Sequence, residues 1–411
     1  MHLEILPIEK KQYAILFRML RKKHRLTQQE IADRCGISLR SYQSLEAGKL
    51  LKDDEHYEKI LAIYHLHHDA HMDEYVEFHQ LTKRLSNAFA YYHDKEVSIL
   101  LAELSEALSK QSGAFSKIAC EACVLMKEIL EQERGFTNEE AEKWLELCGC
   151  LSGSIKDVMA FLLYQREYAY RHDRLFLAKL YERYISQSNA YRLLITAALH
   201  LVNLSDNQIA AYRLLRICLK QSRKAENHTG EVDALAYLAS VCGICAKNEF
   251  VYYASLCEKQ FAAYEDLEEK RKLAAVHNLA QCYADMGMYE KAIKWFACYL
   301  NDDRSVQLPA LLWYMDAQFA FNGMLSKEAI VIRDLSKASK ALQKCWSYYD
   351  AYFKGKDVYF LERCLMKEVL PVLKGLHPAF HQVFHKQLVW LVKQTKHYKS
   401  LYEFECVLAY R

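Results

Sequence analysis

Apolar residues recur three or four positions apart along almost the whole chain, which is the spacing of one face of an α-helix. The stretch ILLAELSEALSK, residues 99–110, shows this pattern clearly. The alternation of apolar and polar residues that marks a strand is hard to find. Only 12 Gly and 4 Pro interrupt 411 residues. The pattern therefore predicts an all-α fold, and the length predicts two or more domains.

The clearest local pattern is LTQQEIADRCGISLRSYQSLEAG, residues 26–48. Thr27 is suited to cap the start of a helix, and Glu30 three residues later completes a capping box. Gly36 permits the positive φ of a sharp turn. Ser38 then caps a second helix. Two short capped helices joined by a tight turn are expected here.

The second of these helices, from residue 39, has an inner and an outer face. Tyr42 and Leu45 are one turn apart and are expected to be buried. The remaining positions then point outward, and they are Leu39, Arg40, Gln43 and Ser44. A tight turn followed by a helix with an exposed polar face is the spacing of a helix-turn-helix.

This segment resembles the Cro/C1-type (XRE) helix-turn-helix domain over roughly the first 65 residues. Arg21 and Glu46 stand where that family places a charge pair between helices 1 and 3. The resemblance implies phosphate contacts from Gln28 and Ser41, and base contacts from residues of the second short helix. The full set expected to meet double-stranded operator DNA is Gln28, Ser38, Leu39, Arg40, Ser41, Gln43 and Ser44.

Arg40 is the first candidate for reading a base, because its guanidinium can bridge O6 and N7 of guanine. Leu39 departs from the polar residue common at its position in the family. It either touches a thymine methyl group or indicates a different register of contacts. A helical hairpin with no nucleic-acid role is the competing interpretation, and it would require the caps, the glycine and the Arg/Glu pair to coincide by accident.

Charge is distributed unevenly. Residues 1–52 contain 11 Lys or Arg and 5 Asp or Glu, a net charge of +6, whereas the whole chain is +3. The remaining residues therefore carry −3. A basic segment on a nearly neutral body favours a phosphate-binding module.

Other classes of protein find little support. The first residues, MHLEILPIEKK, lack the apolar core of a secretory signal, and no stretch of about 18 residues is apolar and free of charge. A cytoplasmic protein with no membrane segment is expected. No acid/base pair, phosphate loop or nucleophile with its base stands at a telling spacing, so no enzymatic activity and no cofactor are expected.

Two groups of residues suggest a metal site. The 14 cysteines include the C-x-x-C pairs Cys120/Cys123 and Cys242/Cys245, and five histidines cluster at His65, His67, His68, His71 and His79. The cysteine pairs lie inside helical patterns and lack the glycine turns of zinc knuckles. Buried, reduced thiols and a solvated polar connector are the favoured interpretations, so no metal is expected.

The chain is expected to comprise a helix-turn-helix domain (1–66), a linker helix (67–94) and a series of helix pairs (95–411). The clearest pair is residues 273–299, with Leu279, Ala280 and Tyr283 on one helix and Ala292, Phe296 and Tyr299 on the other. This unit resembles the tetratricopeptide repeat. Weaker copies occupy residues 159–185, 191–218, 232–258 and 309–335. The resemblance implies a right-handed α-solenoid with a concave surface.

A helix-turn-helix joined to such a solenoid resembles the RNPP group of peptide-sensing quorum regulators from Gram-positive bacteria. The resemblance implies a homodimer whose solenoid binds a short linear signalling peptide and changes its geometry or oligomeric state. The peptide-contacting residues expected on the concave face are Asn278, His277, Gln281, Asn203, Tyr164 and Asn322. The alternative is a DNA-binding regulator, such as a phage-type repressor, gated by a protein partner.

Overall fold

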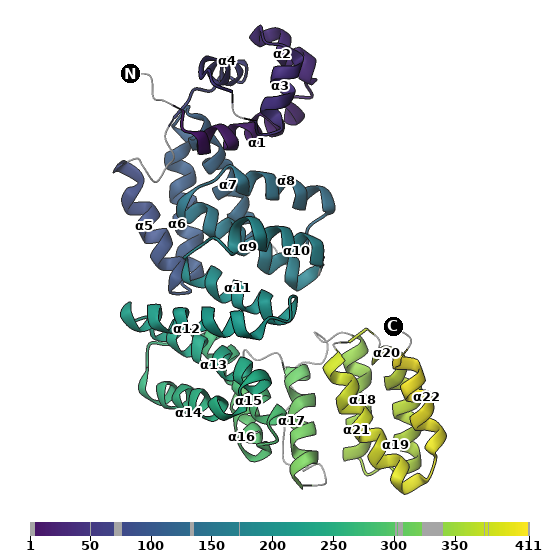
Figure 1. Cartoon of the computed structure of the whole chain (residues 1–411). Coiled ribbons are helices and arrows are strands. Elements are labelled where there is room, and N and C mark those ends of the chain that lie inside the picture. The colour runs from purple at the N-terminus through teal and green to yellow at the C-terminus, as the bar shows by residue number, and fades with distance from the viewer. Residues whose placement is uncertain are drawn as a thin grey trace. The chain divides into compact units, whose positions relative to one another are not determined.

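The computed structural model describes residues 5–49, 51–69, 76–131, 135–171, 173–300, 302, 307–322, 340–373, 375–376 and 378–409. The all-α prediction is confirmed, because every regular element in these ranges is a helix (Figure 1). The β-type contact recorded among them is one isolated backbone bridge between His67 and Gly113. No helix in the same ranges combines the length and apolar character needed to span a membrane.

The chain divides into two compact units, residues 1–234 and 235–411. Unit 1 contains α1 (Pro7–Lys23), α2 (Gln28–Cys35), α3 (Leu39–Glu46), α4 (Glu55–Ile63), α5 (Val76–Ala90), α6 (Asp94–Ser109), α7 (Ala114–Glu131), α8 (Asn138–Gly149), α9 (Gly153–Tyr170), α10 (Arg174–Leu180), the π-helical turn Tyr181–Ile185, α11 (Tyr191–Asn203) and α12 (Gln208–Lys224). The boundary falls within α13 (His228–Cys245).

Unit 2 contains α14 (Lys247–Ala263), α15 (Glu269–Asp285), α16 (Tyr289–Leu300), α17 (Gln307–Asn322), α18 (Lys340–Phe353), α19 (Val358–Cys364), the π-helical turn Leu365–Val369, α20 (Leu370–Leu373), α21 (Pro378–Thr395) and α22 (Tyr398–Ala409). The predicted linker helix corresponds to α5, which begins later and ends earlier than residues 67–94.

The residues predicted to cap α2 and α3 make the expected hydrogen bonds. The backbone N–H of Glu30 donates to Thr27 Oγ1 (3.2 Å), and the N–H of Thr27 donates to the Glu30 carboxylate (2.6 Å). Gly36 ends α2 with φ +66°. Ser38 Oγ accepts the N–H of Ser41 (3.0 Å) at the start of α3. The predicted capping box, turn and second cap are confirmed.

Helices α1–α4 form the N-terminal bundle around a core of their own. Tyr13 and Phe17 from α1 stack with ring centroids 5.5 Å apart, and Tyr57 of α4 lies 6.2 Å from each ring. Ile31 and Tyr42 bring α2 and α3 into this core, and all five side chains are fully buried. Burial of these aromatic and branched side chains is the main stabilising term for so small a bundle.

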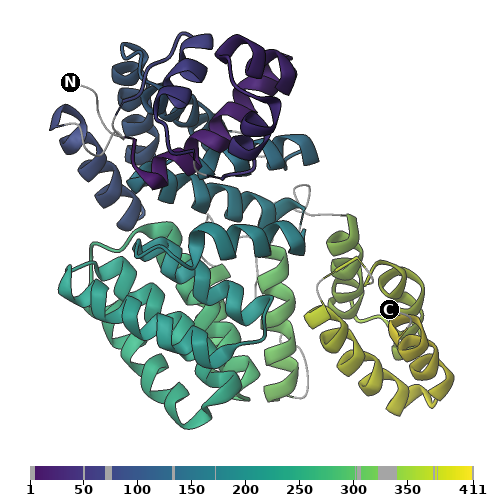
Figure 2. The ribbon, with the colours of Figure 1, turned by 45° about the horizontal axis from the view of Figure 1, so that its top comes forward.

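The N-terminal bundle also packs on the helices that follow it. The ring of Tyr13 stacks on Phe115 of α7 at 4.8 Å, and the side-chain amide of Gln12 donates to the carbonyl of Leu151 (3.3 Å). Helices α1 and α8 are in contact, as Figures 1 and 2 show, and Ile15 lies over Gly149, where a Cβ would be 2.9 Å from Ile15 Cδ1. The bundle is therefore part of unit 1.

Asp69, between α4 and α5, fixes the same junction. Its buried carboxylate accepts the backbone N–H groups of Phe115 (2.8 Å) and Ser116 (3.0 Å) and the hydroxyl of Ser116 (2.7 Å). It therefore caps α7 from a distant segment, because the first N–H groups of a helix lack intrahelical partners. Gly113 makes room for it, since a Cβ there would lie 1.9 Å from Asp69 Oδ2.

Arg192 is a buried cation that contacts several helices of unit 1. The guanidinium of Arg192, on α11, lies 4.1 Å from the ring centroid of Phe161 on α9 and 4.8 Å from that of Phe89 on α5. It donates to the carboxylate of Asp94, at the start of α6, at 2.6 Å. Cation–π contacts and one ion pair thus join four helices.

Residues 273–299 form the predicted helix pair, α15 and α16. Gly287 provides the positive φ (+72°) of the turn between them. Ala280 and Tyr283 of α15 and Ala292 and Phe296 of α16 are buried, as the sequence predicted. The pairs α9 with α10 and α11 with α12 occupy the segments predicted as weaker copies, and so does α13 with α14. Of the segment 309–335, only the part in α17 lies among the described residues.

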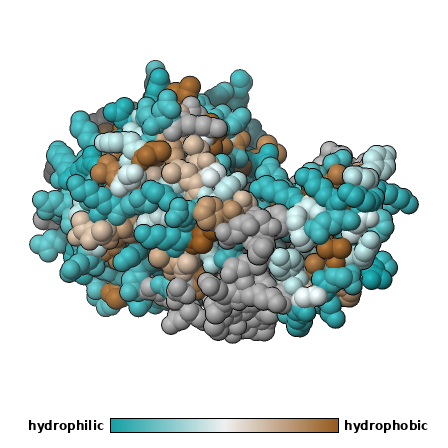
Figure 3. Space-filling model, turned by 90° about the horizontal axis from the view of Figure 1, so that it is seen from below, coloured by the Kyte–Doolittle hydropathy of each residue, from teal (hydrophilic) through white to brown (hydrophobic). Residues whose placement is uncertain are grey.

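The surface drawn in Figure 3 is mainly hydrophilic, with hydrophobic residues scattered among the polar ones. The exposed apolar side chains of the described residues include Leu175 and Tyr402, which are 77% and 69% exposed. Single exposed apolar residues are normal on protein surfaces and by themselves indicate no binding site.

Candidate nucleic-acid interface

Helix α3 has one buried and one exposed face. Tyr42 and Leu45 are 0% and 1% exposed, whereas Arg40 and Gln43 are exposed. Leu39 and Ser44 are half-buried on the outer face. Arg40 makes no hydrogen bond or ion pair with any other described residue. Its guanidinium is therefore available to a base or phosphate, as direct readout of a major groove requires.

Glu46 fixes the orientation of α3. Its carboxylate accepts Arg21 Nε at 2.6 Å and Arg21 Nη2 at 3.2 Å, so the predicted pair between α1 and α3 is present. The hydroxyl of Tyr42 donates to Oε1 (2.8 Å), and the side-chain amide of Gln28 donates to Oε2 (2.7 Å). Burial alone would raise the pKa of Glu46, but the hydrogen bonds from Arg21, Gln28 and Tyr42 outweigh it and lower the pKa.

Two of the expected DNA contacts are joined to each other. Gln43 Nε2 donates to Gln28 Oε1 at 3.4 Å, so these side chains meet between α2 and α3. The hydroxyls of Ser38 and Ser41 lie 2.8 Å apart at the start of α3. The structure thus brings six of the seven residues to α3 or its N-cap, with Gln28 beside them. Their roles on DNA remain predictions.

Acidic residues of α7 and α8 meet the basic end of α1. Lys23 pairs with Glu121 (2.8 Å), and Glu146 lies 3.1 Å from Arg18 Nε and 3.7 Å from Lys22 Nζ. The paired residues are about 100 to 130 positions apart in the sequence, so helical periodicity could not predict these contacts. The positive field of the N-terminal bundle is partly neutralised by the helices that follow.

The residues expected to contact a peptide lie in different units. In unit 1, the hydroxyl of buried Tyr164 pairs with His200 Nδ1 (2.9 Å), and the exposed amide of Asn203 donates to the hydroxyl of Tyr168 (3.2 Å). The first of these is a contact between α9 and α11. The second lies on the surface of unit 1.

In unit 2, three of the four expected residues lie on α15, and Asn322 is the last residue of α17. Asn278 is half-buried and makes no hydrogen bond with a described residue. The ring of His277 packs against Tyr299 of α16, with centroids 5.0 Å apart, and burial lowers its pKa. Gln281 Nε2 donates to Asp285 (3.0 Å). The side chain of Asn322 lies outside the described residues.

Several residues of the C-x-x-C pairs and of the histidine cluster make contacts within the helix packing. Cys120 Sγ donates to the carbonyl of Ser105 (3.3 Å), and burial raises the pKa of Cys123. His68 Nδ1 pairs with the Tyr13 hydroxyl at 2.6 Å. Cys242 is fully buried, and the side chains of Cys245 and His71 lie outside the described residues. Across the described part of the chain, no three His, Cys, Asp or Glu residues gather as a metal site would require.

Comparison with known protein families identifies one match. Residues 17–70 match a family model described as helix-turn-helix. Searches of curated proteins and of solved structures gave no match. The match ends at residue 70, so it lends no support to the tetratricopeptide and RNPP resemblances. Residues 17–70 contain the exposed face of α3, and the match therefore supports a DNA-binding transcriptional regulator.

Proposed function

We propose that the protein is a sequence-specific transcriptional regulator that reads its operator through the exposed face of α3. The observation that carries this proposal is the exposed guanidinium of Arg40, which has no partner among the described residues, on a helix whose opposite face, Tyr42 and Leu45, is buried. A helix held in this way presents its side chains to the major groove without local rearrangement. The expected contacts remain those of Gln28, Ser38, Leu39, Arg40, Ser41, Gln43 and Ser44.

We further propose that residues 95–411 sense a short linear signalling peptide in quorum sensing, and that the protein acts as a homodimer. An extended peptide of about seven residues spans roughly 23 Å, a length that suits a row of stacked helices. Exposed amides such as Asn203 and the half-buried Asn278 offer partners for a peptide backbone. The proposed division is a DNA-binding domain at 1–66, a linker at 67–94 and a sensing domain beyond.

The proposed mechanism is a shift between two states of a dimer. Half-sites one helical turn apart require about 34 Å between the two recognition helices. A ligand that carries the balance from 1:99 to 99:1 must prefer one state by about 5.5 kcal/mol. A protein partner in place of the peptide is the second candidate, since DNA binding alone does not distinguish them.

Fluorescence polarisation with DNA from upstream of the gene tests the first proposal. Arg40→Ala should weaken specific binding about tenfold or more, because a bidentate arginine–guanine contact contributes about 1–3 kcal/mol. Arg213→Ala is the matched control, since Arg213 is exposed on α12, has no partner among the described residues and removes the same charge. Equal DNA affinity of the two variants would show that Arg40 does not contact the operator.

The same assay tests the peptide. The small-peptide fraction of spent culture medium should change the polarisation of the wild-type complex. A DNA signal that is indifferent to this fraction, but altered by a protein from the host, would replace the peptide with a protein partner.

A further inference from the structure

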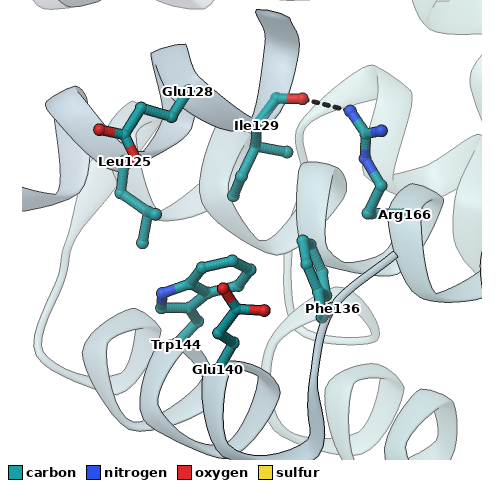
Figure 4. Close-up of a pocket in the computed structure, with 7 residues that line it drawn as sticks. All are labelled: Leu125, Glu128, Ile129, Phe136, Glu140, Trp144 and Arg166. Atoms are coloured by element: carbon teal, nitrogen blue, oxygen red, sulfur yellow. Dashed lines mark hydrogen bonds between the residues drawn. The ribbon is translucent and has the colours of Figure 1, made fainter. Parts of the chain in front are cut away.

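Unit 1 contains a cavity of about 70 Å³ between α7, α8 and α9 (Figure 4). None of the residues expected from the sequence to bind DNA or peptide lines it. Two of its walls are aromatic. Phe136 and Trp144 meet at 90° with ring centroids 4.3 Å apart, and both side chains are buried. Perpendicular aromatic walls offer a π-face to a cation.

Two carboxylates complete the walls. Glu128, on α7, is exposed and makes no hydrogen bond or ion pair with another described residue. Glu140, on α8, accepts the backbone N–H of Thr137 through Oε2 (2.8 Å), which orients its carboxylate beside Trp144 (Figure 4). An aromatic wall beside carboxylates suits a group that is both flat or compact and positively charged.

The one cationic side chain of the lining is directed elsewhere. The guanidinium of Arg166 donates to the carbonyl of Ile129 at the edge of the cavity, as Figure 4 shows, and lies 5.3 Å from the ring centroid of Tyr170. With Arg166, Glu128 and Glu140 all charged, the lining carries a formal charge of −1. One monovalent cation would neutralise it, whereas an anion would face two carboxylates.

We propose that this cavity, the α7–α9 pocket, binds a monovalent organic cation, either an ammonium or a guanidinium group. Its volume suits a single such group rather than a whole ligand. This proposal rests on the proposed sensing function in one respect, because the cation would be supplied by the signalling peptide, through its amino terminus, a lysine or an arginine. Binding itself does not depend on that source.

The pocket shares a helix with the N-terminal bundle. Trp144 lies on α8, and two residues later Glu146 pairs with Arg18 and lies 3.7 Å from Lys22 of α1. Helices α1 and α8 are also in direct contact. A group bound against Trp144 therefore acts on the helix on which the recognition unit rests.

Isothermal titration calorimetry of the full chain tests the pocket. The probes are methylguanidinium chloride and ethylammonium chloride, with sodium chloride at equal ionic strength as the reference. Wild-type protein should bind at least one organic cation at a single site. Glu128→Gln should weaken binding about tenfold through loss of a charge-assisted contact. Glu139→Gln, an exposed carboxylate of α8 outside the pocket, should leave it unchanged.

Trp144→Phe locates the site independently, since it keeps an aromatic wall and removes the fluorophore. Cation binding should change the fluorescence of the wild type and leave that of Trp144→Phe unaltered. Heats equal to those of sodium chloride, or unchanged binding by Glu128→Gln with an unchanged melting temperature, would overturn the proposal.

DNA binding measured in the same samples separates the two proposals. If the chain binds the cation but does not bind DNA, the result would support the pocket and contradict the proposed function. Cation binding that leaves DNA affinity unchanged would confirm the pocket and exclude its role in sensing. The stronger of the two probes identifies the source, ammonium or guanidinium.

Discussion

Arg21 donates two hydrogen bonds to the carboxylate of Glu46 and so ties the end of α1 to the end of α3. The side chain of Glu46 is 5% exposed and that of Arg21 is 18% exposed. Because a buried charge that loses its partner is costly, this pair controls the position of the recognition helix more than an exposed ion pair would.

Arg21→Ala should therefore loosen α3. We expect the free energy of local opening, measured by native-state hydrogen exchange of the α3 amides, to fall by about 3 kcal/mol. Lys59→Ala breaks the exposed pair with Glu55 on α4 and should leave the α3 amides unaffected. Unaltered protection of α3 in Arg21→Ala would show that apolar packing alone positions the helix.

The stability of the N-terminal bundle should depend on acid pH through Glu46. Its lowered pKa means that the charged carboxylate stabilises the fold. That contribution is complete above the unfolded pKa of about 4.3 and is lost as the pH falls through the lowered folded value. Pulsed hydrogen exchange after incubation between pH 6 and pH 3 should show this loss. The Glu46→Gln variant should be less stable than the wild type at pH 6, and its stability should change less between pH 6 and pH 3.

Asp69 and Gly113 should behave as a coupled pair. Asp69→Ala removes the acceptor for two N–H groups of α7 and should cost about 2 kcal/mol. Gly113→Ala should destabilise the wild type, because its Cβ would lie 1.9 Å from Asp69 Oδ2, but much less in the Asp69→Ala background. Thermal unfolding of the two single variants and the double variant measures the coupling. Additive losses would contradict it.

Glu146 of α8, which pairs with basic residues of α1, should weaken DNA binding. Glu146→Gln releases Arg18 and Lys22 from their carboxylate, so DNA affinity should rise roughly threefold and the salt dependence should steepen by about one counterion. Glu139→Gln, on the same helix, provides the control for a change in net charge. Equal salt slopes for both variants would place Arg18 and Lys22 away from the phosphates.

Arg192 should be among the least replaceable residues of unit 1. Arg192→Met keeps much of the side-chain volume but leaves Asp94 without its partner and removes the cation from the rings of Phe89 and Phe161. A loss of about 2 kcal/mol is expected, mainly from the desolvated cation–π contacts, because the Asp94 side chain is 50% exposed and stays hydrated without its partner. Asp94→Asn alone should therefore cost much less than Arg192→Met. Chemical denaturation measures both losses, and an Arg192→Met variant as stable as the wild type would contradict this assignment.

The sequence predicted features that depend on neighbours in the chain. The capping box of Thr27 and Glu30, the turn at Gly36 and the pair α15–α16 all follow from spacings of a few residues, and all are present. Contacts between segments far apart in the chain could not be predicted from these spacings. Nothing in the pattern connects Tyr13 with Phe115, because that contact depends on how helices pack rather than on periodicity.

The α7–α9 pocket was missed for a related reason. Phe136, Glu140 and Trp144 are spaced by four residues, as on one helix face, yet the pattern also fits ordinary core packing. Glu128, Leu125 and Arg166 complete the lining from α7 and α9, and the spacing of residues within the chain does not connect them with these three. The predicted peptide contacts depended on a repeat register, and the structure shows that the hydroxyl of Tyr164 already pairs with His200.

The attachment of α1 to α7 and α8 has a consequence for protein engineering. Tyr13 and Gln12 contribute to a seam whose other side consists of Phe115 and Leu151. A chimera that joins residues 1–66 to a foreign sensor domain would expose the ring of Tyr13 and would remove Leu151, the carbonyl acceptor of the Gln12 amide. The smallest portable cassette thus includes α7 and α8, and regulators built by exchanging recognition helices should graft the outer face of α3 alone.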